Sequence, residues 1–306
     1  MNNDVVKKLL NKVAGINGKP VGAYNIRVNG KGIERASTAN IEIKSKTDVD
    51  GINIIVKPNT KNETVHIPVV VDTTGLSDKV YNDFYIGGNS NVSIIAGCGI
   101  HNDGQHLTGH DGIHTFYIGK NSKVKYVEKH YGEGKGLGQR ILNPITVINL
   151  EDGSSLEMET VQIEGVDFTK RETRGNLGKD ANLVIKEKLM TSGRQTAQTN
   201  FDIILSGENS SADVVSRSVA RGESKQVFNS KIVGNSKCKG HSECDAIIMD
   251  RGCVTALPAL VANNVDASLI HEAAIGKIAG EQITKLMTLG LNEEESEHQI
   301  INGFLK

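Results

Sequence analysis

The segment Ile86-Gly87-Gly88-Asn89-Ser90-Asn91-Val92 recurs further along the chain as Ile118-Gly119-Lys120-Asn121-Ser122-Lys123-Val124, and weaker copies begin at Leu150, Leu177 and Leu205. Each copy ends one strand-like run, turns through Gly and Asn or Asp, and begins another run. These turn residues tolerate a positive φ. The spacing of roughly 25–35 residues is typical of a repeat architecture in which successive coils stack on one another.

The runs between these turns alternate polar and apolar residues, as half-buried strands do. Val184-Ile185-Lys186-Glu187-Lys188-Leu189 is an example. Stacked coils would each bury an apolar face against their neighbours. The 33 glycines and the lack of tryptophan also suit short strands and tight turns better than a helical bundle. We therefore predict a mainly β protein with a parallel β-helix core over residues 20–270, and a β-sandwich is the alternative.

Both ends of the chain have a helical pattern instead. A short helix within residues 1–19 is predicted by apolar residues that share one helical face, namely Val5, Val6, Leu9, Leu10 and Val13. After the β-rich region, apolar residues recur at helical spacing over residues 275–289. Asn292 and Glu295 then form a capping-box pattern that begins a last helix. We expect residues 271–306 to be a helical segment that caps the solenoid, docks a partner, or does both.

The bulk properties exclude several classes of protein. A net charge of −1 provides no basic field for nucleic acid or for an anionic membrane. The longest apolar runs fall far short of the roughly 20 residues of a membrane span. The N-terminus lacks the apolar core and the small-residue cleavage site of a secretory signal. We expect a cytoplasmic protein that has no membrane span and binds no nucleic acid.

Three of the four cysteines lie close together, which favours metal or sulfur chemistry over structural disulfides in a reducing compartment. The first candidate is Cys238-Lys239-Gly240-His241-Ser242-Glu243-Cys244, because thiolates and imidazole suit zinc or iron. On an extended strand, however, Cys238 and Cys244 point to one face and His241 to the other. The three residues are either ligands or two buried thiols that flank an exposed histidine.

The second and third candidates follow along the chain. Cys253 comes after a buried run and an expected Asp-Arg-Gly turn, where its thiol can be exposed and Arg251 can favour the thiolate. His271 and Glu272 are adjacent at the point where the strand pattern gives way to the helical one. Together with a thiolate they make the mixed sulfur, nitrogen and oxygen ligand set that iron accepts. The alternative for His271 is a helix cap.

A glycine-rich segment after Cys98 is the fourth candidate, because it contains His101, Asp103, His106, His110, Asp111 and His114. Its glycines argue against a helix. We expect a solvated loop, with a metal site as the alternative. The sequence shows no P-loop, no dinucleotide-binding fingerprint and no legible Ser-His-Asp order, so we expect no nucleotide-hydrolysing machinery in this chain.

Four C-terminal segments occur in a distinctive order, namely Glu-Cys-Asp-Ala-Ile-Ile at 243–248, Gly-Cys-Val-Thr-Ala-Leu-Pro at 252–258, His-Glu-Ala-Ala-Ile-Gly-Lys-Ile at 271–278 and Ile-Ile-Asn-Gly-Phe-Leu at 300–305. In this order and spacing they resemble the SufB/SufD family of iron–sulfur cluster assembly scaffolds. Ala96-Gly97-Cys98, followed by His114, is more loosely similar to an earlier stretch of that family. The short chain resembles the minimal (SmsB-like) two-component version of the system.

The resemblance implies a right-handed parallel β-helix that works as a homodimer through the end of the helix. It implies that a transient iron–sulfur cluster forms at the dimer interface and that the C-terminal helices dock an ABC-type ATPase (SufC-like) subunit. Cys253 matches the functional cysteine of SufB-type chains. His271 and Glu272 match the histidine and the acid that face this cysteine from the other subunit. Cys238 and His241 lie outside the usual family pattern.

We therefore expect a scaffold rather than an enzyme, with ATPase activity in the partner subunit. The scaffold would collect iron and sulfide or persulfide at Cys253, His271 and Glu272 and pass the cluster to apo-proteins. Cys238, His241 and Cys244 remain a second ligand set. One alternative is a β-solenoid enzyme that acts on polysaccharide, although the chain has few aromatics and no obvious acid pair for that chemistry. The other is a binding module without metal.

Overall fold

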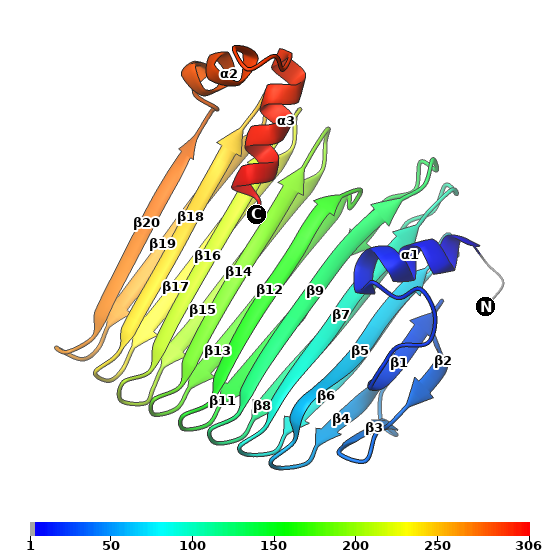
Figure 1. Ribbon diagram of the computed structural model, residues 1–306, viewed down its shortest axis with the longest axis vertical. Coiled ribbons are helices and arrows are strands. Elements are labelled where there is room, and N and C mark those ends of the chain that lie inside the picture. The colour runs from blue at the N-terminus through cyan, green and yellow to red at the C-terminus, as the bar shows by residue number, and fades with distance from the viewer. Residues whose placement is uncertain (1–3) are drawn as a thin grey trace.

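The computed structural model describes residues 4–306 as a stack of coils with one helix near its N-terminal end and two near its C-terminal end (Figure 1). Each coil contributes a strand to each of two ten-stranded sheets. Neighbouring strands are parallel, except in the antiparallel pairs β1–β2 and β3–β4 at the first coil. This pairing confirms the β-solenoid prediction and excludes the sandwich, whose sheets are antiparallel.

The two sheets are called A and B, and their strands are given in spatial order. Sheet A consists of β2 (Lys31–Ala36), β1 (Ala23–Val28), β5 (Lys61–Val71), β7 (Asn91–His101), β9 (Lys123–Glu133), β12 (Ser155–Glu164), β14 (Asn182–Thr191), β16 (Ser211–Ala220), β18 (Lys239–Ile248) and β20 (Ser268–Gly276). Sheet B consists of β19 (Cys253–Ala262), β17 (Lys225–Gly234), β15 (Thr196–Leu205), β13 (Phe168–Leu177), β10 (Arg140–Leu142) with β11 (Ile145–Leu150), β8 (Thr108–Ile118), β6 (Ser77–Ile86), β4 (Gly51–Val56) and β3 (Ile41–Ser45). The helices are α1 (Asp4–Ala14), α2 (Gly280–Met287) and α3 (Glu293–Phe304).

The recurring segment occupies the same place on successive coils of sheet B. Its first residues are buried and pair in register from strand to strand, in the series Ile86, Ile118, Leu150, Leu177 and Leu205. The turn after each of them contains a residue with a positive φ, in the series Asn89, Asn121, Gly153, Asp180 and Asn209. Asn, Asp and Gly are the residues that adopt this conformation at least cost. The predicted turn, repeated once per coil, is confirmed.

The core fills the lumen between the two sheets, because every second side chain of each strand points inward. Stacking of like residues from coil to coil is most visible at Phe84 and Phe116, whose ring centroids lie 4.3 Å apart. The ring of Tyr126, from sheet A, meets Phe116 at a centroid distance of 5.0 Å. The lumen is therefore a close-packed interior that joins both sheets.

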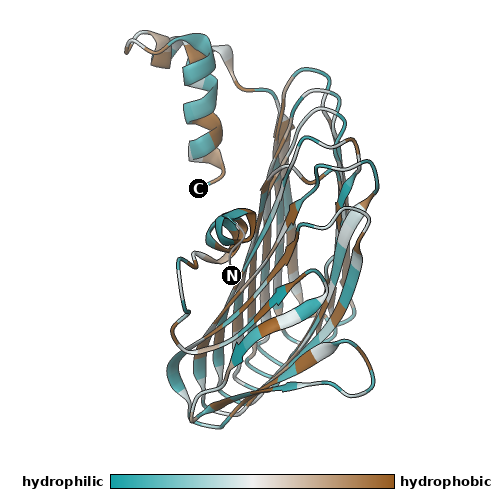
Figure 2. Ribbon diagram, turned by 90° about the vertical axis from the view of Figure 1, so that its right-hand side faces the viewer, coloured by the Kyte–Doolittle hydropathy of each residue, from teal (hydrophilic) through white to brown (hydrophobic). Residues whose placement is uncertain are grey.

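Helix α1 lies on the outer face of sheet A, where it packs against β5, β7 and β9 (Figures 1 and 2). Two glycines of β7 leave space for it. A Cβ on Gly97 would lie 2.8 Å from the carbonyl oxygen of Val13, and one on Gly99 would lie 3.1 Å from Cβ of Leu9. The predicted N-terminal helix is confirmed, and the glycines on either side of Cys98 allow the helix to dock.

Helix α3 lies on the same outer face at the other end of the solenoid (Figure 2). Its Ile301 and Leu305 are buried in a cluster with Val219 of β16. The predicted capping box is present, because Asn292 accepts a hydrogen bond from the backbone of Glu295 at 2.8 Å and Glu295 accepts one from the backbone of Asn292 at 2.8 Å. None of the described helices combines the length and the apolar character of a membrane-crossing segment.

The helical structure begins later than the sequence predicts. Residues 271–276 belong to β20, whose pairing with β18 continues to Gly276, and α2 begins only at Gly280. The prediction of a helix over residues 275–289 is therefore wrong at its start. The helical spacing of the apolar residues there competes with a full ladder of backbone hydrogen bonds to the preceding coil, and the ladder prevails.

Candidate functional site

The C-terminal end of the solenoid is open, because β19 and β20 are the last strands of their sheets. Their outer edges present backbone groups that no further strand within residues 4–306 pairs, which is the usual template for association with another chain. Apolar side chains are exposed here. Leu257 is 59% exposed, Ile270 is 52% exposed, and Val265, in the turn between the two strands, is fully exposed. These side chains lie on β19, on β20 and in the turn between them, so apolar groups are exposed along the whole of the last coil.

Cys253 lies at this open end as the first residue of β19. The predicted turn before it is present, with Asp250 at a φ of 56°. Of the four cysteines, all within the described residues, Cys253 alone is exposed. Arg251, which the sequence placed beside the thiol, is hydrogen-bonded to Glu223 on the preceding coil.

His271 and Glu272 lie in the middle of β20 and not at a junction between strand and helix. His271 pairs with Ser242 and points to the lumen side, and Glu272 pairs with Glu243 and points outward. The helix-cap alternative for His271 is wrong, because β20 continues past it to Gly276. The Nδ1 atom of His271 is buried and has no hydrogen-bond partner within residues 4–306. Seven other buried side-chain atoms of the described residues are in the same state, and water, an ion or a second subunit can satisfy such an atom.

A single chain does not bring the three predicted residues together. Cys253 is in sheet B, whereas His271 and Glu272 are in sheet A. In the part of the chain that the structure describes, one group of three His, Cys, Asp or Glu side chains has its ligand atoms within 4.8 Å of one another, and Cys253 is not in it. That group is His241, Glu243 and Glu272.

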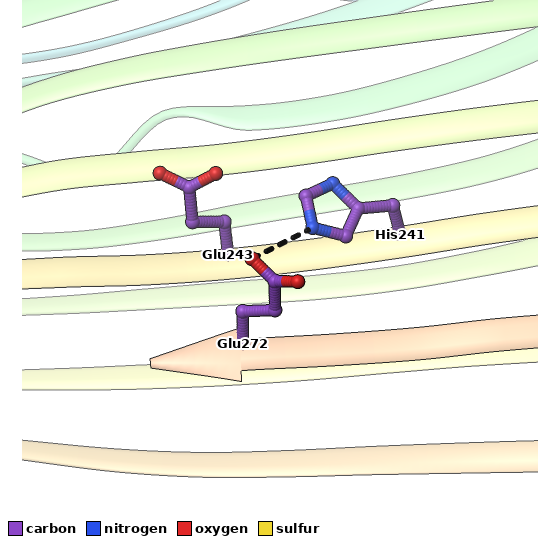
Figure 3. A group of neighbouring side chains, drawn as sticks. All are labelled: His241, Glu243 and Glu272. Carbon is purple, nitrogen blue, oxygen red and sulfur yellow. Dashed lines mark ion pairs between the residues drawn. The ribbon is translucent and has the colours of Figure 1, made fainter. Parts of the chain in front are cut away.

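The group stands on the outer face of sheet A, with two members on β18 and one on β20 (Figure 3). The Nε2 atom of His241 lies 4.0 Å from Oε2 of Glu272, and its Nδ1 atom lies 2.8 Å from Oδ1 of Asp213. Burial, followed by a hydrogen bond and repulsion from Asp245, raises the pKa of Glu243. Sequence reasoning missed Glu243. The coil register could have found it, since Glu243 and Glu272 occupy equivalent places on successive coils.

Cys238 and Cys244 do not join His241, because their side chains point into the lumen while His241 points outward. Burial raises the pKa of the Cys238 thiol. Burial, together with the nearby carboxylates of Glu187 and Asp245, raises the pKa of Cys244 to about 12. Both thiols are therefore held protonated at neutral pH, the state that binds metal least well.

The histidine-rich segment is only partly the solvated loop that the sequence predicts. His106 is exposed, but His110 and His114 are inward residues of β8 and are buried. The Nδ1 atom of His110 lies 3.1 Å from Asp78, and that of His114 lies 2.8 Å from the hydroxyl of Tyr126. Burial lowers the pKa of His114 to about 4. The loop prediction is wrong for these two histidines because the strand pattern resumes at Thr108 and alternation then directs every second side chain inward.

Charged side chains continue this polar core along the lumen. Arg171 donates a hydrogen bond to Glu128 at 2.7 Å and lies 3.6 Å from Glu187. Glu187 also accepts hydrogen bonds from Thr199 at 2.9 Å and Ser216 at 2.7 Å. Burial opposes ionisation of Glu128, but the positive charges nearby, Arg171 among them, hold its pKa well below the usual range. The charges of the lumen satisfy one another.

Comparison with known proteins identifies the family to which this chain belongs. Residues 84–304 match the family model described as SUF system FeS cluster assembly, SufBD core domain. The chain belongs to the SufBD family. The resemblance found in its C-terminal segments is thus confirmed, and the matched region contains Cys253, His271, Glu272 and both C-terminal helices.

Individual relatives agree with this assignment. An iron–sulfur cluster assembly SufBD family protein of Archaeoglobus fulgidus is 29% identical over 85% of this chain and 69% of its own length. A SufBD family protein of Pyrococcus horikoshii is 26% identical over 96% of this chain and 84% of its own length. One from Methanothermobacter thermautotrophicus is 29% identical over 71% of this chain. The matched region covers about half the length of that relative. A chloroplastic SufBD family protein of Arabidopsis thaliana is 26% identical over 64% of this chain and 37% of its own length.

Proposed function

We propose that this chain is a scaffold on which an iron–sulfur cluster is assembled between two copies of the chain and then passed to apo-proteins. The observation that carries the proposal is the position of Cys253. It is the exposed cysteine of a SufBD core and begins an edge strand at the open end of the solenoid. The iron–sulfur cluster is cargo in this account, and the chain itself performs no catalytic reaction.

A second copy is the occupant that best fits the open end. Each copy offers two unpaired strand edges and exposed apolar side chains, and a two-fold axis would set identical surfaces against each other. In such a homodimer, Cys253 of one copy could face β20 of the other, from which His271 projects towards the lumen and Glu272 outward, so the two side chains would approach the cluster from opposite sides of that strand. This arrangement would also explain why one chain alone leaves the thiol apart from its proposed co-ligands and Nδ1 of His271 without a partner.

The three side chains supply complementary ligands. A thiolate, an imidazole and a carboxylate form the mixed set that iron accepts. The thiol of Cys253 must lose its proton before it can bind iron, so assembly is expected to weaken as the solution becomes acidic. We expect the reaction to take place in the cytoplasm, where thiols stay reduced.

The C-terminal helices are the proposed docking site for an ABC-type ATPase subunit. Helix α2 has no buried residue, and apolar side chains at its end remain exposed, with Met287 at 45% and Leu289 at 75%. Helix α3 is held to sheet A through Ile301 and Leu305. A partner bound to α2 would therefore be coupled through α3 to the strands near the open end. ATP binding by that partner is expected to move the two copies relative to each other.

Complementation between two defective variants tests the composite site. Cys253→Ala and His271→Ala are each expected to lose the cluster after anaerobic reconstitution with Fe²⁺ and sulfide. When the two variants are unfolded together and refolded as a mixture, half of the dimers are mixed, and each mixed dimer contains one intact site. Cluster absorption should then recover to about a quarter of the parent level.

Each variant refolded alone is the control and should recover nothing. If the mixture also recovers nothing while the parent, treated in the same way, regains its cluster, the two-chain site is wrong. If either variant alone keeps a full cluster, the ligand assignment is wrong.

A further inference from the structure

The pairing register of β18 with β20 brings together three outward side chains, those of His241, Glu243 and Glu272. Glu243 and Glu272 are direct neighbours across the β18–β20 ladder, and His241 stands two residues before Glu243 on the same face. Side chains that are two apart on one strand, or opposite on paired strands, share a face and can meet. The three ligand atoms accordingly lie within 4.8 Å of one another. A first-row cation with bonds near 2 Å holds its ligand atoms within about 4 Å of one another, so small side-chain rotations would bring these three atoms onto one ion.

The imidazole of His241 is oriented for a ligand. An ionised carboxylate can only accept hydrogen bonds, so Nδ1 of His241 carries the proton that it shares with Asp213 at 2.8 Å. Nε2 then keeps its lone pair and lies 4.0 Å from Glu272. A carboxylate behind one ring nitrogen fixes the tautomer and the orientation of metal-binding histidines in the same way. Asp213 belongs to β16, so three successive coils of sheet A build the group.

The electrostatics of the group also differ from the rest of this face. Two outward glutamates of β12, on the same sheet, each have a lysine on the neighbouring strand. Glu157 pairs with Lys186 at 3.2 Å, and Glu159 pairs with Lys188 at 2.7 Å. At β18 and β20 two glutamates stand opposite each other instead, and the residues that the structure describes give neither of them a lysine or arginine ion pair. Like charges directly opposite on paired strands are destabilising, and a bound cation would relieve the repulsion.

We propose that His241, Glu243 and Glu272 bind a divalent first-row cation, ferrous iron in the working protein, on the outer face of sheet A. One nitrogen and two carboxylate oxygens form a harder ligand set than the thiolate of Cys253, so the site suits free Fe²⁺ before it combines with sulfide. The identity of the metal rests on the proposed function, whereas the site itself rests on the geometry. Glu272 is common to this site and to the proposed assembly site, so captured iron would lie on the outer face of β20, next to the strand position of His271 but on the other side of the sheet.

Metal binding without sulfide tests the proposal. The full chain with Cys253→Ala is titrated anaerobically with Fe²⁺, and separately with Mn²⁺ followed by electron paramagnetic resonance, so that the exposed thiol takes no part. We expect a single cation per chain. His241→Ala and Glu243→Gln, each added to this background, should weaken binding roughly tenfold or more, and Asp213→Asn should weaken it about tenfold through the imidazole.

Glu157→Gln is the matched control, because it removes an outward carboxylate of the same sheet outside the group and should leave the affinity unchanged. All of these side chains point outward, so circular dichroism and thermal unfolding should confirm that the variants fold. The proposal is overturned if the background chain binds no cation, or if Glu243→Gln binds as tightly as Glu157→Gln. If this cation site is overturned but the parent chain still assembles a cluster, the proposed scaffold function is retained. If the chain binds the cation but the parent assembles no cluster, the cation site is retained and the proposed scaffold function is wrong.

Discussion

The lumen between β8 and β14 and the open end at β19 and β20 both contain ionisable side chains, but the charged groups of the lumen pair with one another. In the lumen, Glu128 and Glu187 share Arg171. At the open end, Cys253 is exposed and His271 has a buried nitrogen without a partner in the described chain. The paired charges of the lumen contribute to the fold, whereas the groups at the open end are the ones that we propose bind the cluster between two copies.

Removal of a lumen charge should have the largest effect on stability. Arg171→Met leaves two buried carboxylates, those of Glu128 and Glu187, without their cation. Breaking a buried ion pair from one side costs about 3–5 kcal/mol, because the remaining charge is uncompensated. We expect a loss of this size in the free energy of unfolding, measured by urea denaturation.

Arg174→Met is the control for this loss. Arg174 lies on the same strand, but its side chain is 64% exposed and pairs with Glu172 on the surface. Exposed pairs of this kind contribute about 0–1 kcal/mol. Equal losses for the two variants would show that the lumen network does not hold the fold.

Acid should destabilise the fold through His114, which burial keeps neutral in the folded chain. The pKa of His114 is about 4 in the folded chain, so this imidazole stays neutral there, whereas the unfolded chain binds the proton below its ordinary value of about 6.5. The stabilisation is present above that value and is lost as the pH falls towards 4. The expected loss in the free energy of unfolding is about 2 kcal/mol between pH 7.5 and pH 5.

His114→Gln should therefore flatten the dependence of the unfolding free energy on pH over this interval. His106→Gln, at an exposed position in the loop before β8, controls for the loss of a histidine in general. If His114→Gln leaves the slope of the parent intact, the histidine is not held neutral by burial.

The open end can be tested by adding charge. Leu257 is 59% exposed, so Leu257→Asp should change the stability of the isolated fold little, whereas in a homodimer it would bring two like charges together. We expect the dissociation constant of the dimer, from sedimentation equilibrium, to rise about tenfold or more, which is at least about 1.4 kcal/mol. Ile204→Asp, an equally outward change two strands back on sheet B, should leave it unaltered. A parent that stays monomeric at high concentration would contradict the dimer.

The solenoid could be predicted from sequence because the same turn sequence recurs once per coil. Asn89 and Asn121 mark it through a residue type that tolerates a positive φ, which is local information. The burial of His110 and His114 could not be read from their glycine-rich surroundings, because it depends on where the next strand resumes. The end of β20 was missed because its pairing with β18 is a contact between coils.

The candidate site shows the same limit. Cys253, His271 and Glu272 were found through their order and their family resemblance, and the structure gave the direction of each side chain. Glu243 could not be identified as a candidate ligand from the sequence, because only the strand register places it opposite Glu272. Register between coils is a long-range property. It becomes predictable only once the coil spacing is applied residue by residue along the chain.

The most direct test of the central claim is anaerobic reconstitution of single cysteine variants with Fe²⁺ and sulfide, followed by visible absorption and Mössbauer spectroscopy. Cys244→Ala, which removes a buried thiol, serves as the matched control. The account predicts that Cys244→Ala assembles the same cluster as the parent and that Cys253→Ala assembles none that survives desalting. A Cys253→Ala chain that holds the parent's cluster in full would contradict the assignment of Cys253 as the ligand on which assembly depends.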